Sequence, residues 1–82
     1  SEMCIRDSSH AVPHLIERLE DKEEDVMVRH EAAEALGAIG DRTALSVLER
    51  FVDDDEVVIA ESCEVALDLL EWVASKRLDY SD

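Results

Sequence analysis

The chain has 82 residues, of which 22 are acidic and only 8 are basic, so its formal net charge at pH 7 is −14. This excess of carboxylates argues against nucleic acids and anionic membrane surfaces as partners, because both are bound through Lys and Arg. A basic protein is a better match. The sequence shows no apolar run of about 18 residues and no secretory signal, so we expect a soluble chain in the cytoplasm.

Residues 1–8 have no helical periodicity. The run from Met3 to Ser8 resembles the translated end of a sequencing-library adaptor, so we predict that residues 1–8 are an adaptor-derived scar and disordered. An ordinary disordered N-terminus is the alternative. Under either interpretation Cys4, which lies in this run, carries no argument, so Cys63 is the one informative cysteine. There is then no disulfide framework, which favours a reducing compartment.

The rest of the chain predicts helices only. We expect a helix over about residues 10–20, a loop at 21–25, a helix over 26–39, a corner at Gly40-Asp41, a helix over 42–52, a loop at 53–56 and a long helix over 57–76. Two segments repeat each other: AVPHLIERL at 11–19 aligns with TALSVLERF at 43–51. The sequence therefore predicts an all-α solenoid of two helical hairpins.

Residues suited to helix ends and turns support these boundaries. Asp25 is a natural N-cap, as is Asp54 or Asp55 for the last helix. Pro13 suits the first turn of its helix, and Gly40 suits a left-handed stop before Asp41 caps the next helix. Gly37 is different, because a glycine inside a helix costs about 1 kcal/mol relative to alanine. We expect a neighbouring helix to pass close to it.

The helix over 26–39 carries an apolar stripe. Its members are Val28, Ala32, Ala35, Leu36 and Ile39. His30, Glu34 and Gly37 lie nearly opposite, at about 100° per residue. We therefore expect the imidazole of His30 to point away from the core of its own helix.

Three neighbouring side chains, those of His30, Glu31 and Glu34, have donor atoms that suit a metal. Imidazole nitrogen and carboxylate oxygen match iron, zinc or manganese, and His30 and Glu34 can project toward one point. His30 and Glu31 lie about 100° apart, so they would share one centre only if other helices converged on it. A solvated polar face is the alternative. The second repeat has Glu61 and Ser62 at these positions and does not repeat the pair.

Acidic residues concentrate in the two predicted hairpin loops, which should share one edge of the array. They are Glu20, Asp21, Glu23, Glu24 and Asp25 in one loop, and Asp53, Asp54, Asp55 and Glu56 in the other. Two interpretations remain open. The carboxylates can form a solvated rim that complements the positive ends of the following helices, or they can guide a cationic ligand.

The stretch VRHEAAEALGAIGD, at residues 28–41, resembles the HEAT-like repeat of the phycobilin lyase type, with Arg29 at the position of that repeat's recurrent arginine. A narrower resemblance is to the C-terminal end of the deoxyhypusine hydroxylase family. It rests on MVRHEAAEALGAI at 27–39, ESCEVALDLLEW at 61–72 and a tail with Asp79-Tyr80. It implies a HEAT-like repeat at 9–41 that carries the His-Glu pair, and a terminal capping repeat with its tail at 42–82.

That family is similar to a superhelix of HEAT-like repeats with four His-Glu pairs around a di-iron centre. It hydroxylates deoxyhypusine on a translation factor, as an oxidoreductase of hypusine biosynthesis. The resemblance implies that His30 and Glu31 are iron ligands and that Met27 and Glu34 line a substrate pocket. It assigns no catalytic residue here, and iron would be held only with the missing N-terminal repeats, so the piece alone should be inactive. The alternative is a non-catalytic HEAT-like module that binds a protein partner.

Overall fold

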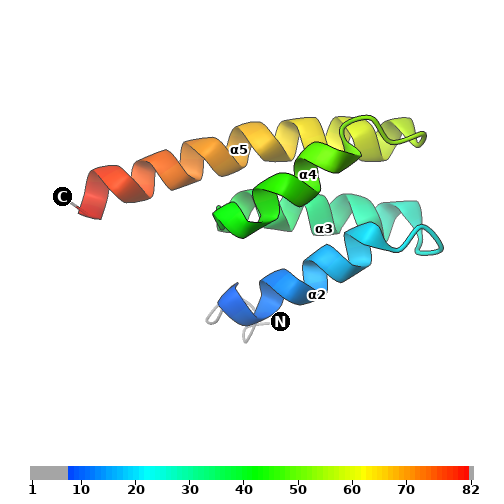
Figure 1. Cartoon of the computed structure of the whole chain (residues 1–82), viewed down its shortest axis with the longest axis horizontal. Helices are drawn as coiled ribbons and strands as arrows, with labels where there is room; N and C mark the ends of the chain where they lie inside the picture. Colours follow the sequence, from blue (N-terminus) through cyan, green and yellow to red (C-terminus); the bar gives the residue numbers. More distant parts are fainter. Residues whose placement is uncertain (1–7, 82) are drawn as a thin grey trace.

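A computed structural model of the chain describes residues 8–81, with side chains placed for residues 11–76. Its elements are α2 at Ser8–Glu20, α3 at Val26–Ile39, the short 3-10 helix η1 at Arg42–Ala44, α4 at Leu45–Phe51 and α5 at Val57–Ser81. Every regular element in this range is helical, which confirms the predicted fold class (Figure 1). The prediction for residues 1–8 lies outside the described residues, apart from Ser8, where α2 begins.

The helices form two hairpins, α2 with α3 and α4 with α5. The loops that close the two hairpins lie at the same end of the molecule, as expected for stacked repeats (Figure 1). The elements differ from the predicted ones in three respects, the first of which is that α2 begins at Ser8 and not at about residue 10. The predicted helix over 42–52 divides into η1 and α4, and α5 continues to Ser81. None of the helices in the described part combines the length and the apolar character needed to cross a membrane.

Capping residues fix both ends of α3 and the start of η1. The Asp25 carboxylate accepts a hydrogen bond of 2.8 Å from the N–H of Met27. Gly40 ends α3 in the left-handed conformation, with φ of 74°, and donates its N–H to the Leu36 carbonyl. Asp41 accepts from the N–H of Thr43 at 2.9 Å. These three predictions are confirmed.

The expected position of Pro13 in its helix is wrong. Because α2 begins at Ser8, Pro13 is the sixth residue of the helix and lies in its second turn. A proline there has no N–H to donate to the carbonyl of the preceding turn, so one backbone hydrogen bond of α2 is missing.

Helix α3 lies in the middle of the array and packs against both α2 and α5. Its buried residues are Arg29, Ala32, Ala33, Leu36 and Gly37. The predicted stripe is therefore wrong at one edge, since Val28 is 38% exposed. Gly37 was placed opposite the stripe but is buried against α5. A helix covered on two sides needs two buried faces, and a single apolar stripe does not describe it.

Gly37 permits the close packing of α3 on α5. A Cβ atom at this position would lie 2.8 Å from the carbonyl oxygen of Ala66 and 3.1 Å from its Cβ. No side chain larger than hydrogen fits without moving one helix. The expected reason for a glycine inside this helix is confirmed.

Arg29 joins the two hairpins from inside. Its side chain is buried, and its Nε–H donates a hydrogen bond of 3.0 Å to the Leu19 carbonyl at the end of α2. Its Nη2 lies 3.8 Å from Oδ1 of Asp54, which belongs to the loop of the second hairpin. The Phe51 ring covers the guanidinium, with 5.6 Å from Cζ to the ring centroid. One cation therefore contacts α2, α4 and the second loop.

Candidate metal-ligand groove between α3 and α5

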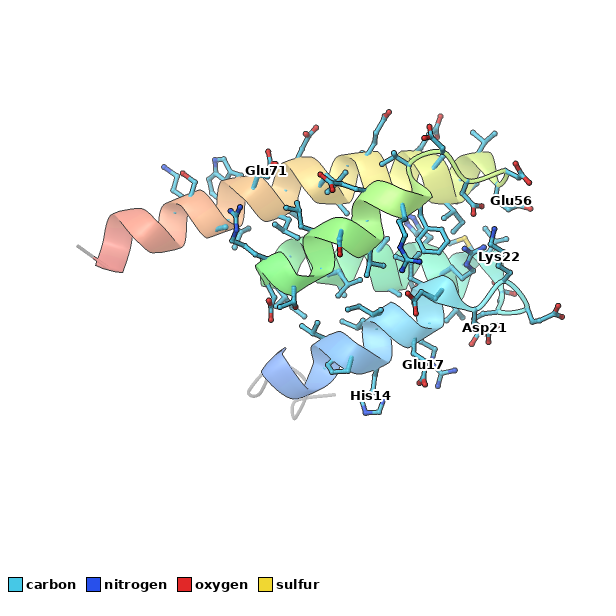
Figure 2. All side chains as sticks on the ribbon, viewed as in Figure 1. His14, Glu17, Asp21, Lys22, Glu56 and Glu71 are labelled. Carbon is cyan, nitrogen blue, oxygen red and sulfur yellow. The ribbon has the colours of Figure 1, made fainter. Side chains whose placement is uncertain are left out.

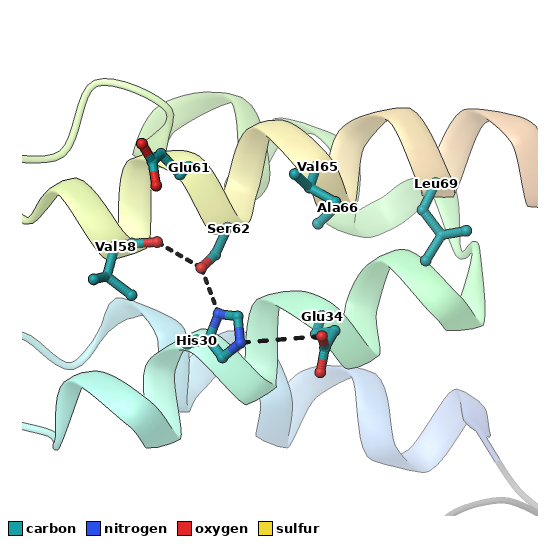
Figure 3. Close-up of a pocket in the computed structure, with 8 residues that line it drawn as sticks. All are labelled: His30, Glu34, Val58, Glu61, Ser62, Val65, Ala66 and Leu69. Atoms are coloured by element: carbon teal, nitrogen blue, oxygen red, sulfur yellow. Dashed lines mark hydrogen bonds and ion pairs between the residues drawn. The ribbon is translucent and has the colours of Figure 1, made fainter.

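A groove of about 290 Å³ runs between the second helices of the two hairpins. Helix α3 contributes His30 and Glu34. Helix α5 contributes the remaining wall, which consists of Val58, Glu61, Ser62, Val65, Ala66 and Leu69 (Figure 3). The groove thus has an apolar floor with an imidazole, a hydroxyl and two carboxylates beside it.

His30 reaches from α3 across the groove to α5. Its Nδ1 lies 2.5 Å from Oγ of Ser62, and the Ser62 hydroxyl donates to the Val58 carbonyl at 2.5 Å (Figure 3). Its Nε2 lies 4.0 Å from Oε2 of Glu34, a side chain that is 69% exposed. The His30 side chain itself is 33% exposed. The imidazole therefore stands at the edge of the core, with one nitrogen held by the next repeat.

The structure separates the other predicted site residues. Glu34 lines the groove with His30, whereas Glu31 and Met27 are exposed and are not among its lining residues. Met27 is 57% exposed. The metal-ligand and substrate-pocket assignments of His30, Glu31, Met27 and Glu34 stay predictions.

The donor chemistry of this groove suits iron, but the set of donors is incomplete. Imidazole nitrogen and carboxylate oxygen are ordinary iron ligands. Across the described residues, however, no three His, Cys, Asp or Glu side chains come together in a way that could hold a metal ion. A centre at this position would need ligands from further helices, so no chemical step through iron follows from this chain alone.

The acidic loops are partly neutralised within the protein. Arg18 pairs with Glu24 at 3.0 Å, Arg50 pairs with Glu20, and Nζ of Lys22 lies 3.4 Å from Oδ1 of Asp54. Figure 2 shows Asp21, Lys22 and Glu56 together at this end of the molecule. Exposed carboxylates remain at Glu23, Asp53, Asp55 and Glu56. The edge therefore combines internal ion pairs with a solvated negative surface.

Asp54 is the most enclosed of these carboxylates. Burial raises its pKa, but the hydrogen bond from the N–H of Glu56 and the charges of Lys22 and Arg29 outweigh burial and leave the pKa below its ordinary 3.8. Asp54 therefore stays ionised and balances the buried guanidinium of Arg29.

Cys63 is fully buried and not part of a disulfide. Burial raises the pKa of its thiol to about 11, with Arg29 opposing the shift and Asp54 adding to it. A neutral, enclosed thiol is a packing residue and not a nucleophile. The expected burial of Cys63 on the last helix is confirmed.

Ser62 is the contact that the sequence analysis missed. The sequence singles it out only as a position where the metal-type pair is absent. In the repeat alignment Ser62 corresponds to Glu31, and Glu61 corresponds to His30. Stacking of adjacent repeats brings the second helices together, but the contact joins His30 to the residue after its equivalent position. The alignment alone therefore points to this part of α5 and not to Ser62 itself.

Comparison with known proteins identifies deoxyhypusine hydroxylases among the relatives of this chain. The chain is 50% identical over 72 residues to the deoxyhypusine hydroxylase of Danio rerio, covering 88% of this chain and 24% of the relative. It is 56% identical over 64 residues to that of Chaetomium globosum, covering 76% and 19%. The chain thus spans about a quarter or less of the length of these relatives. The predicted resemblance to this family is confirmed.

A solved structure and a family profile agree with the fold. The structure of human deoxyhypusine hydroxylase in complex with glycerol superposes with a TM-score of 0.78 and 43% identity, covering 83% of this chain and 24% of that one. The profile described as HEAT repeats matches residues 3–68. Most of the sequence lies within that match, and the helical hairpins described above have the architecture of these repeats. The chain therefore belongs to the HEAT-repeat family.

Proposed function

We propose that the chain is a segment of an iron-dependent monooxygenase that hydroxylates deoxyhypusine on a translation factor, and that His30 and Glu31 supply one pair of its iron ligands. The observation that carries the proposal is 50% identity over 72 residues to a relative named for this activity. The position of His30 supports it, because the imidazole has one nitrogen on the groove side and is one-third exposed.

The remaining ligands would come from repeats that the longer relatives have and this chain does not. Residues 9–41 would form the repeat that carries the ligand pair, and residues 42–82 the terminal repeat with its tail. When bound, the di-iron centre would supply the activation of dioxygen. The residues of this chain would hold the metal and shape one wall of the site.

The substrate would be a basic protein segment with a modified lysine. The exposed carboxylates of the two loops would attract it, since a negative edge raises the local concentration of a cationic partner. Glu34 at the mouth of the groove would face the cationic side chain, and Met27 would extend the apolar wall. We place the protein in the cytoplasm, in keeping with the unpaired thiol of Cys63.

A chimeric enzyme tests this proposal. Residues 11–81 replace the matching segment of the Danio rerio hydroxylase, and the purified chimera is assayed for bound iron and for hydroxylation of a deoxyhypusine-bearing substrate. We expect an active, iron-loaded chimera, and we expect His30→Ala or Glu31→Ala to lose both properties. His14→Ala is the matched control, because His14 is exposed on the outer face of α2 (Figure 2).

Two results would contradict the proposal. One is a folded chimera without iron or activity, and the other is a His30→Ala chimera that retains its full iron content. The second candidate function is a HEAT-like module for protein interaction. It is favoured by the exposed apolar side chains along α5, namely Val57, Val58, Val65 and Trp72. A folded but iron-free chimera would support it.

A further inference from the structure

We propose that Ser62 is a positioning residue for His30: it holds the imidazole as the tautomer protonated on Nδ1 and thereby turns an unprotonated Nε2 toward the groove. The inference starts from two contacts of one oxygen atom. Oγ of Ser62 lies 2.5 Å from the Val58 carbonyl oxygen and 2.5 Å from Nδ1 of His30. The first distance is at the short end for an O–H···O hydrogen bond, and the second is shorter than an ordinary N–H···O bond. At such separations each contact requires a proton between its two atoms.

The supply of protons decides the tautomer. A serine hydroxyl has one proton and two acceptor lone pairs, whereas a carbonyl oxygen has no proton to give. The contact between Ser62 and Val58 must therefore use the hydroxyl proton, in the bond to the i−4 carbonyl that serines commonly form inside helices. The second contact must then take its proton from the imidazole. His30 is the donor, through Nδ1–H.

The opposite arrangement leaves an unfavourable contact. If the Ser62 hydroxyl donated to an unprotonated Nδ1, the Ser62 and Val58 oxygens would face each other at 2.5 Å with no proton between them. The geometry therefore favours Nδ1–H over Nε2–H.

The surroundings of Nε2 do not reverse this preference. Oε2 of Glu34 lies 4.0 Å from Nε2, beyond hydrogen-bond distance, and the Glu34 side chain is 69% exposed. Glu61 also lines the groove but is exposed. Solvent weakens the pull of both carboxylates on a proton at Nε2. The Nε2 lone pair therefore remains available on the groove side.

The consequence for a metal rests on the proposed function. A ligating histidine usually donates its other N–H to a neighbouring group, which fixes the tautomer and the ring orientation. Ser62 would have this role for His30. Loss of such a partner typically weakens metal binding by roughly 10- to 100-fold. The tautomer itself can be measured without metal.

Imidazole nitrogen spectra of the isotope-labelled 82-residue chain test the first step. A long-range proton–nitrogen correlation experiment, at a pH where imidazoles are neutral, distinguishes the protonated nitrogen from the unprotonated one. We expect His30 to be protonated on Nδ1. Exposed His14 is the internal control and should show the Nε2–H form that free histidine prefers. A wild-type His30 protonated on Nε2 would overturn the proposal.

Variants of Ser62 test the cause. Ser62→Ala should shift His30 toward the Nε2–H form, and Ser62→Thr, which keeps a hydroxyl, should restore Nδ1–H. Ser46→Ala, at an exposed serine of α4, should change nothing. Circular dichroism checks that each variant is helical. If Ser62→Ala fails to fold, the wild-type and Ser62→Thr spectra still decide the tautomer. An unchanged tautomer in folded Ser62→Ala would refute the role of Ser62.

Iron binding by the chimera tests the consequence. We expect Ser62→Ala to weaken iron(II) affinity by roughly 10- to 100-fold and Ser62→Thr to restore it. A shifted tautomer with unchanged affinity would overturn the positioning role. If the unaltered chimera has the Nδ1–H tautomer at His30 but takes up no iron, the proposed function fails and the tautomer assignment stands.

Discussion

Gly37→Ala should destabilise the chain, although alanine is the better helix former. Helix propensity alone favours alanine by about 1 kcal/mol at a position inside a helix. The added Cβ would, however, lie 2.8 Å from the carbonyl oxygen and 3.0 Å from the Cα of Ala66. Both are backbone atoms of α5, so no side-chain rotation relieves the overlap, and the two helices must move apart.

The balance of these effects sets the magnitude. Overpacking a tight interior contact costs typically 1–3 kcal/mol, and a backbone overlap belongs at the upper end of that range. After the gain in propensity is subtracted, we expect a net loss of about 1–2 kcal/mol. In a domain of this size that loss lowers the melting temperature by roughly 5–15 °C. Ala66→Gly should not rescue it, because the nearest atom is the backbone oxygen.

Thermal and urea denaturation followed by circular dichroism measure the effect. Ala38→Gly, at the adjacent exposed position of α3, is the matched control for propensity without packing and should cost about 1 kcal/mol. A Gly37→Ala variant as stable as the wild type, or more stable, would show that α3 and α5 are not in close contact at this position.

Further predictions concern three residues of the core and of the joint between the hairpins. In a Cys4→Ser background, Cys63 should resist alkylation in the folded chain and react only on unfolding; fast labelling of native protein would contradict its burial. Its thiol pKa of about 11 lies above the ordinary 9.0. Its contribution to stability should therefore be complete below pH 9 and decline toward pH 11, and a Cys63→Ala variant in urea titrations should lack this decline. The pKa of Asp54 is lowered on folding, so its contribution should be complete above about pH 5 and disappear as acid protonates the folded carboxylate. Asp54→Asn should remove this acid dependence and cost about 1–3 kcal/mol at pH 7, because buried Arg29 loses the carboxylate that lies 3.8 Å from its Nη2. Equal stability at pH 7 would refute the pairing. Gly40→Ala should lower the melting temperature by several degrees, because φ of 74° strains an L-residue and its Cβ would meet Val73 at 2.5 Å. An unchanged melting temperature would show that residue 40 does not need the left-handed backbone conformation that ends α3.

The helices and the caps of α3 and η1 could be predicted because they depend on local chemistry. Asp25, Gly40 and Asp41 each act within a few residues, and the capping side chains and the left-handed turn occur where the residue types require them. The repeated segments predicted the hairpins because each repeat has the same local pattern of two helices and a loop. At Gly37 the sequence also predicted a tertiary contact, because a poor helix former inside a helix indicates a close neighbour.

The faces of α3 could not be predicted from its own periodicity. A single-helix pattern cannot show that α3 is covered by both α2 and α5, so Val28 was placed inside and Gly37 on the far side. Arg29 illustrates the same limit, because the groups that permit its burial come from Leu19 and Asp54, far away in sequence. Contacts of this kind arise from stacking, and the partner of His30 on α5 is another example.

The burial of Arg29 affects how the two hairpins unfold. In a nearest-neighbour description of repeat proteins, the interface between units decides whether they melt separately or together. If only the second hairpin unfolded, Arg29 would lose its contacts with Asp54 and Phe51, while its hydrogen bond to the Leu19 carbonyl would keep it at the surface of the first hairpin. The loss of its counter-charge raises the free energy of this half-unfolded state. Fraying from the far end of α5 should therefore stop before this joint, and the two hairpins should melt in one cooperative transition.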